Sequence, residues 1–179
     1  MTAVVVYESM YGSTRAVAEA VAEGLREAHV RTEVVEVGAL ESRGGEVPAG
    51  TTLLVVGGPT HAFSMSRPAT RAEATTYATG ALVSTGHGIR EWLDHVDLPD
   101  GVAFATFDTK VAKPPLPGSA ARAAAKRLRA RGCRALVRPH SFLVQGRTEG
   151  LHDGELEKAH HWGKGLAIAA GPRLRGAAS

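Results

Sequence analysis

The chain has 179 residues, 44% of them hydrophobic, which is enough to bury the core of one domain. Its formal charge of +3 is too small to predict a nucleic-acid partner, and its apolar runs fall short of the ~18 residues that a membrane-spanning helix needs. The lone cysteine, Cys133, excludes a disulfide framework and a cysteine metal cluster, and it fits a reducing cytoplasm. We therefore expect a cytoplasmic protein with no membrane insertion and no nucleic-acid partner.

The first part of the chain alternates short β-branched runs with stretches of helical spacing. Residues 3–7 form a continuous apolar run, which predicts a strand covered on both faces and not a signal peptide. Apolar residues at helical spacing over 17–28 predict a helix, and residues 32–37 predict a second strand. Residues 52–57 predict a third strand. Between these two strands, residues 38–50 predict a polar connection in which any helix is short.

The second part repeats the same alternation. Residues 89–96 have helical spacing, and 102–107 predict a fourth strand. An alanine-rich helix with a serine cap and a final glycine is expected over 119–132. A fifth strand, 135–144, is interrupted by a proline, which suits an edge position or a bulge. The last helix is expected over 154–170, where apolar residues again follow one face.

Strands that alternate with helices predict right-handed crossovers and a parallel sheet with helices on both faces, an α/β fold. We expect one domain over residues 1–171, followed by a frayed tail, 172–179, that has little to bury. Residues 58–87 show only a partial helical pattern, around 69–77. Long irregular segments in compact domains are usually functional or mobile.

The connection between the first strand and the first helix has the composition of a phosphate-binding loop. It reads Ser9-Met10-Tyr11-Gly12-Ser13-Thr14. The helix that follows directs free N–H groups and its positive dipole end at the loop, so hydroxyls and amides can hold a phosphate dianion without Lys or Arg. The alternative is that the hydroxyls only cap a helix. The chain lacks the Gly-x-x-x-x-Gly-Lys of nucleoside triphosphate sites and the Gly-x-Gly-x-x-Gly of dinucleotide folds.

This loop resembles the flavin mononucleotide (FMN) phosphate loop of flavodoxins, in which Ser or Thr, a Gly and a closing Thr recur. A second segment, directly after the third strand, resembles the second flavin loop, whose Pro-Thr pair recurs in flavodoxin-like quinone reductases; it reads Gly58-Pro59-Thr60-His61-Ala62-Phe63. The resemblance covers nearly the whole chain and is closest to actinobacterial flavodoxin-domain proteins. It implies a flavodoxin-like three-layer sandwich, a five-stranded parallel sheet of order 2-1-3-4-5, and FMN as the cofactor.

The resemblance also implies the positions of the flavin contacts. Residues 59–63 would line the isoalloxazine ring, and a third loop, 108–118, would close the site. That loop lacks the Tyr that usually stacks on the ring in flavodoxins, so the candidates for stacking are Phe63, His61 and Phe107. The implied cofactor-binding set is Ser9, Met10, Tyr11, Gly12, Ser13, Thr14, Pro59, Thr60, His61, Ala62, Phe63, Phe107, Asp108 and Thr109. For Phe63 the alternative is ordinary loop packing, and Asp108 is either a proton donor to the flavin or a cap of its own loop.

Charges near the implied site differ from those of flavodoxins, which reach low potentials partly because acidic surroundings destabilise the anionic reduced flavin. Here the candidate site contains Lys110, Lys113 and Arg67, with Asp108 the only nearby acid. A cation at ~4–6 Å from a developing anion stabilises it. We therefore expect a less negative potential for the second reduction step than in acidic flavodoxins.

Two further patterns bear on function. The stretch from Arg122 to Arg138 contains seven bases and no acid, which indicates either a docking patch for an acidic or phosphate-bearing partner or the solvated face of a surface helix. The histidines lack the i, i+4 spacing of helical metal sites, and the chain has no Gly-x-Ser-x-Gly nucleophile elbow. We therefore expect no metal site and no acyl-transfer chemistry.

Three functions stay open on these grounds. The first is an FMN-bound electron carrier between protein partners, which the basic helix favours. The second is an FMN-dependent reductase that takes a nicotinamide donor and a quinone-like acceptor, which the long segment 58–87 favours because a loop over the flavin can shape a substrate pocket. The third is a flavodoxin-like module that has lost FMN and acts as a binding protein, which the missing stacking aromatic keeps open.

Overall fold

The computed structural model describes residues 1–78, 80–112 and 117–175, with the side chains of 172–175 excepted. Its strands are β1 (Thr2–Tyr7), β2 (Arg31–Glu36), β3 (Leu53–His61), β4 (Ser64–Met65), β5 (Ala103–Val111), β6 (Arg134–Ala135) and β7 (His140–Val144). Its helices are α1 (Ser13–Glu27), α2 (Val37–Glu41), α3 (Pro68–Thr76), α4 (Ile89–His95), α5 (Ala120–Ala130) and α6 (Glu155–Arg175). Each strand and helix that the sequence predicts is present. The described residues add the short strand β4, which the sequence did not predict, and the helix α2 of five residues at the start of the predicted connection.

The sheet has the predicted order. Its strands run β2-β1-β3-β5-β6, with β7 also paired to β5, and all of these pairs are parallel. The predicted fifth strand is divided into β6 and β7 around Pro139, which donates no ladder hydrogen bond. The pair β3–β4 is antiparallel and forms a small hairpin beyond the main sheet.

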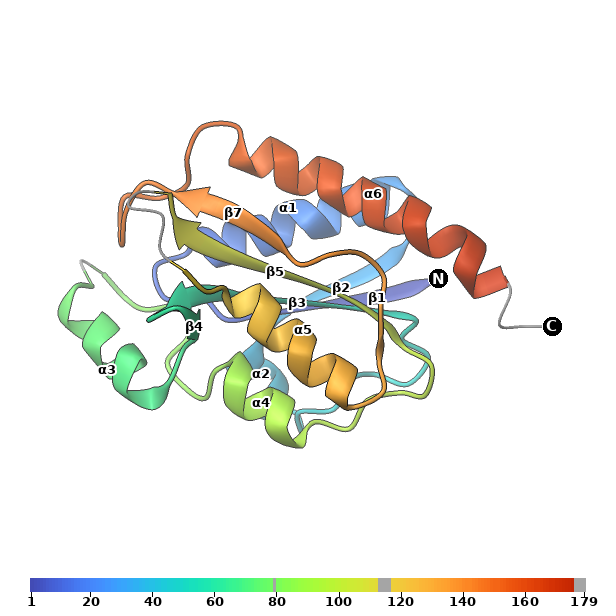
Figure 1. Ribbon diagram of the computed structural model, residues 1–179, viewed down its shortest axis with the longest axis horizontal. Coiled ribbons are helices and arrows are strands. Elements are labelled where there is room, and N and C mark those ends of the chain that lie inside the picture. The colour runs from blue at the N-terminus through green and yellow to red at the C-terminus, as the bar shows by residue number, and fades with distance from the viewer. Residues whose placement is uncertain (79, 113–116, 176–179) are drawn as a thin grey trace.

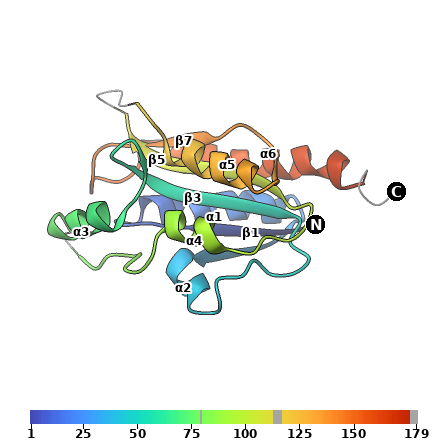
Figure 2. The ribbon, with the colours of Figure 1, turned by 60° about the horizontal axis from the view of Figure 1, so that its bottom comes forward.

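Helices cover both faces of the sheet, which gives three layers (Figures 1 and 2). Strand alternation explains the division: Val5 packs in a core cluster with α1 and α6, while Val4 and Val6 belong to a second cluster with α4 and α5. Helix α6 continues to Arg175, past the last residue of its apolar pattern, so the predicted frayed tail begins inside a helix. Residues 176–179 lie outside the described part of the chain.

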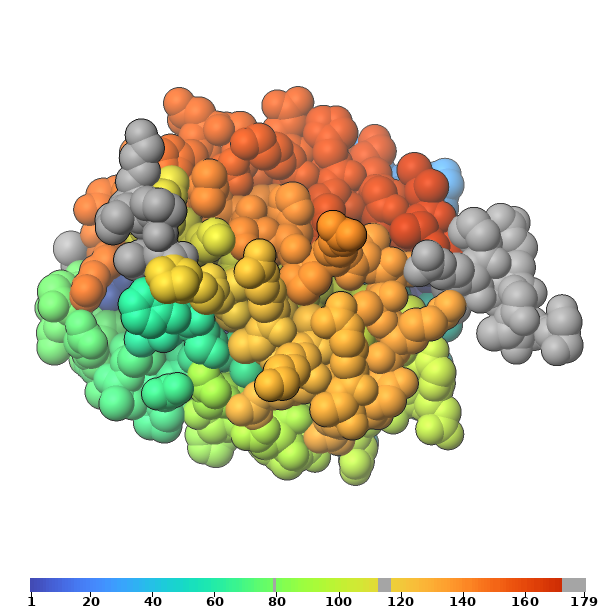
Figure 3. All heavy atoms as spheres, viewed as in Figure 1, coloured from blue at the N-terminus to red at the C-terminus, as the bar shows by residue number. Residues whose placement is uncertain are grey.

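Two arginines of the basic run, Arg127 in α5 and Arg131 directly after it, bind α4 and the residue that follows α4. Arg131 donates hydrogen bonds to the carbonyl oxygens of Leu93, at 3.1 Å, and Val96. Arg127 forms an ion pair with Asp94 of α4. The helix begins at the predicted cap, where the Ser119 hydroxyl accepts from the N–H of Arg122. The outward face of α5 lies open in Figure 3, and Arg122 and Lys126 are exposed.

The long segment 58–87 packs beside the carboxyl ends of the strands. It contains the β3–β4 hairpin and α3, which starts at Pro68 and confirms the partial helical pattern predicted there. It then returns along the first loop, where the N–H groups of Val83 and Ser84 donate to the carbonyl oxygens of Met10 and Ser9 at 3.0 and 2.8 Å. Within the described ranges, no helix has both the length and the apolar character to cross a membrane.

Candidate functional site

A pocket of about 400 Å³ opens at the carboxyl ends of β1, β3 and β5. This is the edge at which ligands bind in open α/β sheets. Five segments contribute its walls: the loop after β1, the β3–β4 hairpin, α3, the end of β5 and the end of β7. The lining residues are Ser9, Met10, Tyr11, Ser13, Thr14, Pro59, Thr60, His61, Ala62, Phe63, Thr70, Glu73, Ala74, Thr109, Lys110, Val111, Val144, Gly146 and Arg147.

The loop after β1 is closed by its own serine and runs directly into the first turn of α1. Gly12 has φ 97°, a left-handed conformation that only glycine adopts without strain, and it caps α1. The Ser9 hydroxyl accepts from the N–H groups of Gly12 and Arg15 at 3.1 and 3.2 Å, which closes the loop on itself. Because they lie in the first turn of α1, the N–H groups of Ser13 and Thr14 have no acceptor within the helix. The loop therefore offers backbone donors and the positive end of the helix dipole to an anion.

A hydroxyl pair forms the floor of the pocket. Thr14, 2% exposed, and Thr109 of β5 share a hydrogen bond of 2.7 Å between their Oγ1 atoms. Only one of the two hydroxyl protons is used in that bond, because the acceptor hydroxyl keeps its own proton to donate. The pair thus supplies one further neutral donor at the deep end of the pocket.

The β3–β4 hairpin forms a second wall and holds an unusual turn. Thr60 pairs with Met65 and His61 with Ser64, so the turn residues are Ala62 and Phe63. Both have positive φ, 44° and 70°, as a two-residue hairpin turn of this twist requires, although neither is glycine. Backbone strain of this kind persists only where the surroundings hold it.

Gly118 holds that turn in place. A Cβ at Gly118 would overlap the carbonyl oxygen of Phe63, so the chain before α5 lies directly against the turn only because residue 118 lacks a side chain. Phe63 is left 52% exposed beside the pocket. The hairpin tip is therefore packed against the chain before α5 and presents an aromatic ring beside the pocket.

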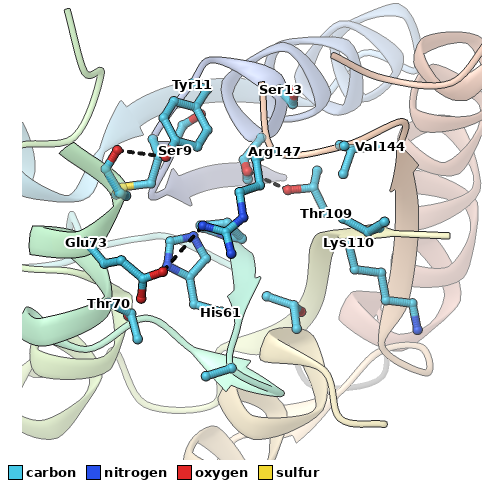
Figure 4. A pocket seen from close by; sticks show the side chains of 18 of the residues that line it. Ser9, Tyr11, Ser13, His61, Thr70, Glu73, Thr109, Lys110, Val144 and Arg147 are labelled. Atoms are coloured by element: carbon cyan, nitrogen blue, oxygen red, sulfur yellow. Dashed lines mark hydrogen bonds and ion pairs between the residues drawn. The ribbon is translucent and has the colours of Figure 1, made fainter. Parts of the chain in front are cut away.

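Two charged side chains meet at the mouth of the pocket. Arg147, from the loop after β7, forms an ion pair of 3.4 Å with Glu73 of α3, and its guanidinium lies 4.3 Å from the centre of the Tyr77 ring. Figure 4 shows Arg147 reaching across the pocket to Glu73, with His61 beside the pair. The Tyr11 hydroxyl donates to the carbonyl oxygen of Ala74 at 2.7 Å and ties the same helix to the first loop.

The mouth is charged, and the deep end is neutral. Burial lowers the pKa of His61, and the nearby guanidinium groups of Arg71 and Arg147 lower it further, so its imidazole is neutral at neutral pH. Among the described residues that line the pocket, Lys110 and Arg147 are the cations and Glu73 is the acid. Any anion held by the first loop therefore rests on hydroxyls and backbone amides.

Comparison with known proteins decides the family. The model of the flavodoxin family, described as Flavodoxin, matches residues 5–162. The chain belongs to the flavodoxin family. A comparison with curated proteins finds no match.

Solved structures share the flavodoxin fold at low sequence identity. Oxidised flavodoxin 1 from Bacillus cereus has a TM-score of 0.66 and 18% identity, over 94% of this chain and 97% of that one. A flavodoxin from the domain Archaea has a TM-score of 0.60 and 21% identity, over 95% and 99% of the two chains. Rubredoxin oxygen:oxidoreductase from Desulfovibrio gigas matches 97% of this chain with 37% of its own, at a TM-score of 0.62 and 18% identity.

Membership of the flavodoxin family implies a flavin, and the residues of the pocket fit FMN. The neutral donors of the first loop suit a phosphate dianion. The aromatic rings of Tyr11, His61 and Phe63 line the same space, and the pocket volume lies within the range of small-molecule sites. Of the predicted cofactor-binding residues, those of the first loop and of the hairpin come together here with Thr109. Gly12 shapes the loop without lining the pocket.

Phe107, one of the three candidates for stacking on a flavin ring, does not line the pocket. Its side chain is 1% exposed and packs edge-on against Phe142 and Trp162, with ring centres 6.0 and 6.1 Å away. It lies directly beneath Gly57 of β3, where a Cβ would overlap its ring. The pleat of β5 directs this residue toward α6, into the core.

Asp108 also lies outside the pocket lining, against the prediction that it contacts the cofactor. It is fully buried, and its Oδ2 accepts hydrogen bonds from the Thr60 hydroxyl at 2.9 Å, from the N–H of Ala121 at 3.0 Å and from the Ser119 hydroxyl. The carboxylate thus fastens the hairpin to the start of α5. Its position is that of a cap and not of a proton donor to a pocket ligand.

The charged residues that line the pocket also differ from those expected. Lys110 lines the pocket, but Arg67 precedes α3 at the surface and does not. Lys113 lies outside the described residues. Among the described lining residues the acid is Glu73 and not Asp108, and Arg147 supplies a cation that the sequence did not indicate. The helical pattern of 69–77 could have placed Thr70, Glu73 and Ala74 on one face, whereas nothing in the sequence around Arg147 indicated its position.

Proposed function

We propose that this member of the flavodoxin family is an FMN-binding electron-transfer protein. The observation that carries the proposal is a set of neutral donors along one side of the pocket, made by the first-turn N–H groups of Ser13 and Thr14 in α1 and by the hydroxyl pair of Thr14 and Thr109, with the hairpin as another wall. FMN, when bound, supplies the capacity to accept and release electrons.

The residues of the chain would bind and orient that group. The N–H groups of Ser13 and Thr14 and one threonine hydroxyl would hold the phosphate at the buried end. The rings of Tyr11, His61 and Phe63 would contact the isoalloxazine system. The exposed ring of Phe63 would mark the edge from which electrons leave, either to a redox partner protein or to a small acceptor. The basic outward face of α5 suits an acidic partner protein.

The second candidate is an FMN-dependent reductase with a nicotinamide donor and a quinone-like acceptor. One observation favours it: α3 and the loop after β7 meet over the mouth of the pocket, through Glu73 and Arg147, and enclose space beside the hairpin. An electron carrier that works only with protein partners has no need of such an enclosure.

A flavin titration tests the proposal. Purified protein, freed of any flavin, is titrated with FMN while flavin fluorescence and absorbance are followed. We expect saturable quenching of the fluorescence and a shifted, structured absorbance band. A linear response without saturation would refute FMN binding and leave the third function, that of a binding module. Oxidation of NADPH by the loaded protein with a quinone and no protein partner would then favour the reductase over the carrier.

A further inference from the structure

The ion pair at the mouth of the pocket is exposed and rests on a single contact. Its two side chains are about 60% and 56% exposed, and they meet through one contact of 3.4 Å. An exposed pair with a single contact contributes little free energy, because solvent screens it and two long side chains must be ordered. Glu73 can therefore be displaced from Arg147 by another anion at small cost.

Arg147 has a second support at the mouth besides Glu73. Its guanidinium lies over the Tyr77 ring, 4.3 Å from the ring centre, and this contact does not involve Glu73. A guanidinium that keeps its aromatic support and loses its carboxylate presents its planar donors to a new acceptor. Carboxylate and sulfonate groups match that planar set of donors.

The rest of the pocket favours an anion at this position. His61, the neighbour of the ion pair in Figure 4, carries no charge at neutral pH. The other described charge in the lining is Lys110, whose ammonium points away from Glu73. Glu73 is the single carboxylate among the described lining residues, so an incoming acidic group meets one like charge there against the two cations Lys110 and Arg147.

On the basis of the proposed FMN function, we propose that the mouth takes a small planar acceptor that carries a carboxylate or sulfonate, and that Arg147 recognises this group by leaving Glu73. For a quinone of this class, the anionic reduced FMN would supply two electrons and one proton, and solvent would supply the second proton, so that the quinone becomes the hydroquinone and the flavin is reoxidised. The acidic group takes no part in the electron transfer. It places the acceptor ring beside the hairpin.

The test compares an anionic with a neutral acceptor. Protein loaded with FMN is photoreduced without oxygen and mixed with 1,4-naphthoquinone-2-sulfonate or with 1,4-naphthoquinone, and the ratio of the two rate constants is measured. We expect Arg147→Gln to lower this ratio about five-fold and Glu73→Gln to raise it about two-fold, since each changes one exposed charge contact. Arg43→Gln is the matched control, because Arg43 pairs with Glu33 at 3.6 Å, with 67% and 48% exposure, away from the pocket; its ratio stays that of the wild type.

Two results would overturn the inference: an unchanged ratio in Arg147→Gln, or a ratio that does not rise in Glu73→Gln. A fall of the ratio in both variants would make the pair a structural bridge. The flavin spectrum, recorded before mixing, separates this failure from failure of the proposed function. If no flavin binds, calorimetry of the flavin-free protein with naphthalene-2-sulfonate and 2-naphthol gives the same comparison. Preference for the sulfonate, lost in Arg147→Gln, supports the anionic mouth, and equal affinity rejects it.

Discussion

Replacing Thr14 with valine removes one hydroxyl from the deep end of the pocket and almost no volume. If that hydroxyl donates to the phosphate of FMN, the variant loses a hydrogen bond to a charged group, which contributes ~1.5–3 kcal/mol. At ~1.4 kcal/mol per factor of ten, the dissociation constant of FMN should rise about 10- to 100-fold. Riboflavin lacks the phosphate, so its affinity should change much less.

The same substitution also breaks the bond between Thr14 and Thr109 and leaves a buried hydroxyl without its partner. We expect this to cost about 1–3 kcal/mol of the free energy of unfolding, measured by urea denaturation. Thr14→Ser keeps the hydroxyl and should retain FMN affinity. Thr32→Val removes a hydroxyl that donates to the carbonyl of Val30 at 3.0 Å, outside the pocket, and controls for threonine loss in general.

Fluorescence titration in the absence of urea, at a pH near neutrality, measures the affinities for both flavins. The four proteins compared are the wild type, Thr14→Val, Thr14→Ser and Thr32→Val. An FMN affinity in Thr14→Val equal to that of the wild type would refute the role of this hydroxyl. An equal loss for FMN and riboflavin would show that the variant disturbs the pocket as a whole, and would also reject the phosphate contact.

The site supports three other predictions. Gly12→Ala forces a side chain into a left-handed conformation at φ 97°, so it should lower the free energy of unfolding in urea by about 1–2 kcal/mol. A decrease of only a few tenths of a kcal/mol would contradict the strain. The pKa of His61 lies below its ordinary 6.5, mainly through burial, so the unfolded chain binds the proton more readily and stability falls as pH drops through 6.5. In thermal melts at several pH values, His61→Gln should therefore lose less stability over this window than the wild type. An identical loss of stability would reject this account. The described lining holds two cations, Lys110 and Arg147, and one acid, Glu73, so the potential of the second reduction step of bound FMN should be less negative than in acidic flavodoxins and more negative in Lys110→Gln. An anaerobic dye titration that finds a strongly negative wild-type potential would disprove this.

The order of elements was predictable because the apolar residues of each strand and helix follow the spacing typical of that element. Apolar β-branched runs such as residues 3–7 occur where strands are covered on both faces, and Ser119 and Gly132 mark the ends of α5 as caps do. The first loop and the hairpin could be placed at one edge because the carboxyl ends of parallel strands meet there.

Other features depend on contacts that a linear pattern does not contain. The sequence places Phe107 at the end of a strand, but only the packing of Phe142 and Trp162 shows that its ring turns into the core. The role of Asp108 depends on Thr60 and Ser119, which approach it from a different strand and from the start of a helix. Arg147 reaches the pocket because β7 lies next to β5, a tertiary arrangement with no local signal.

The central claim is that neutral donors after β1 hold a phosphate dianion. Calorimetric titration of the flavin-free protein with FMN and with riboflavin tests it most directly, because the two ligands differ only in that group. We expect FMN to bind at least about 100-fold more tightly, as several charge-assisted hydrogen bonds would give. Equal dissociation constants for the two ligands would contradict the claim, as would the absence of any heat of binding with FMN.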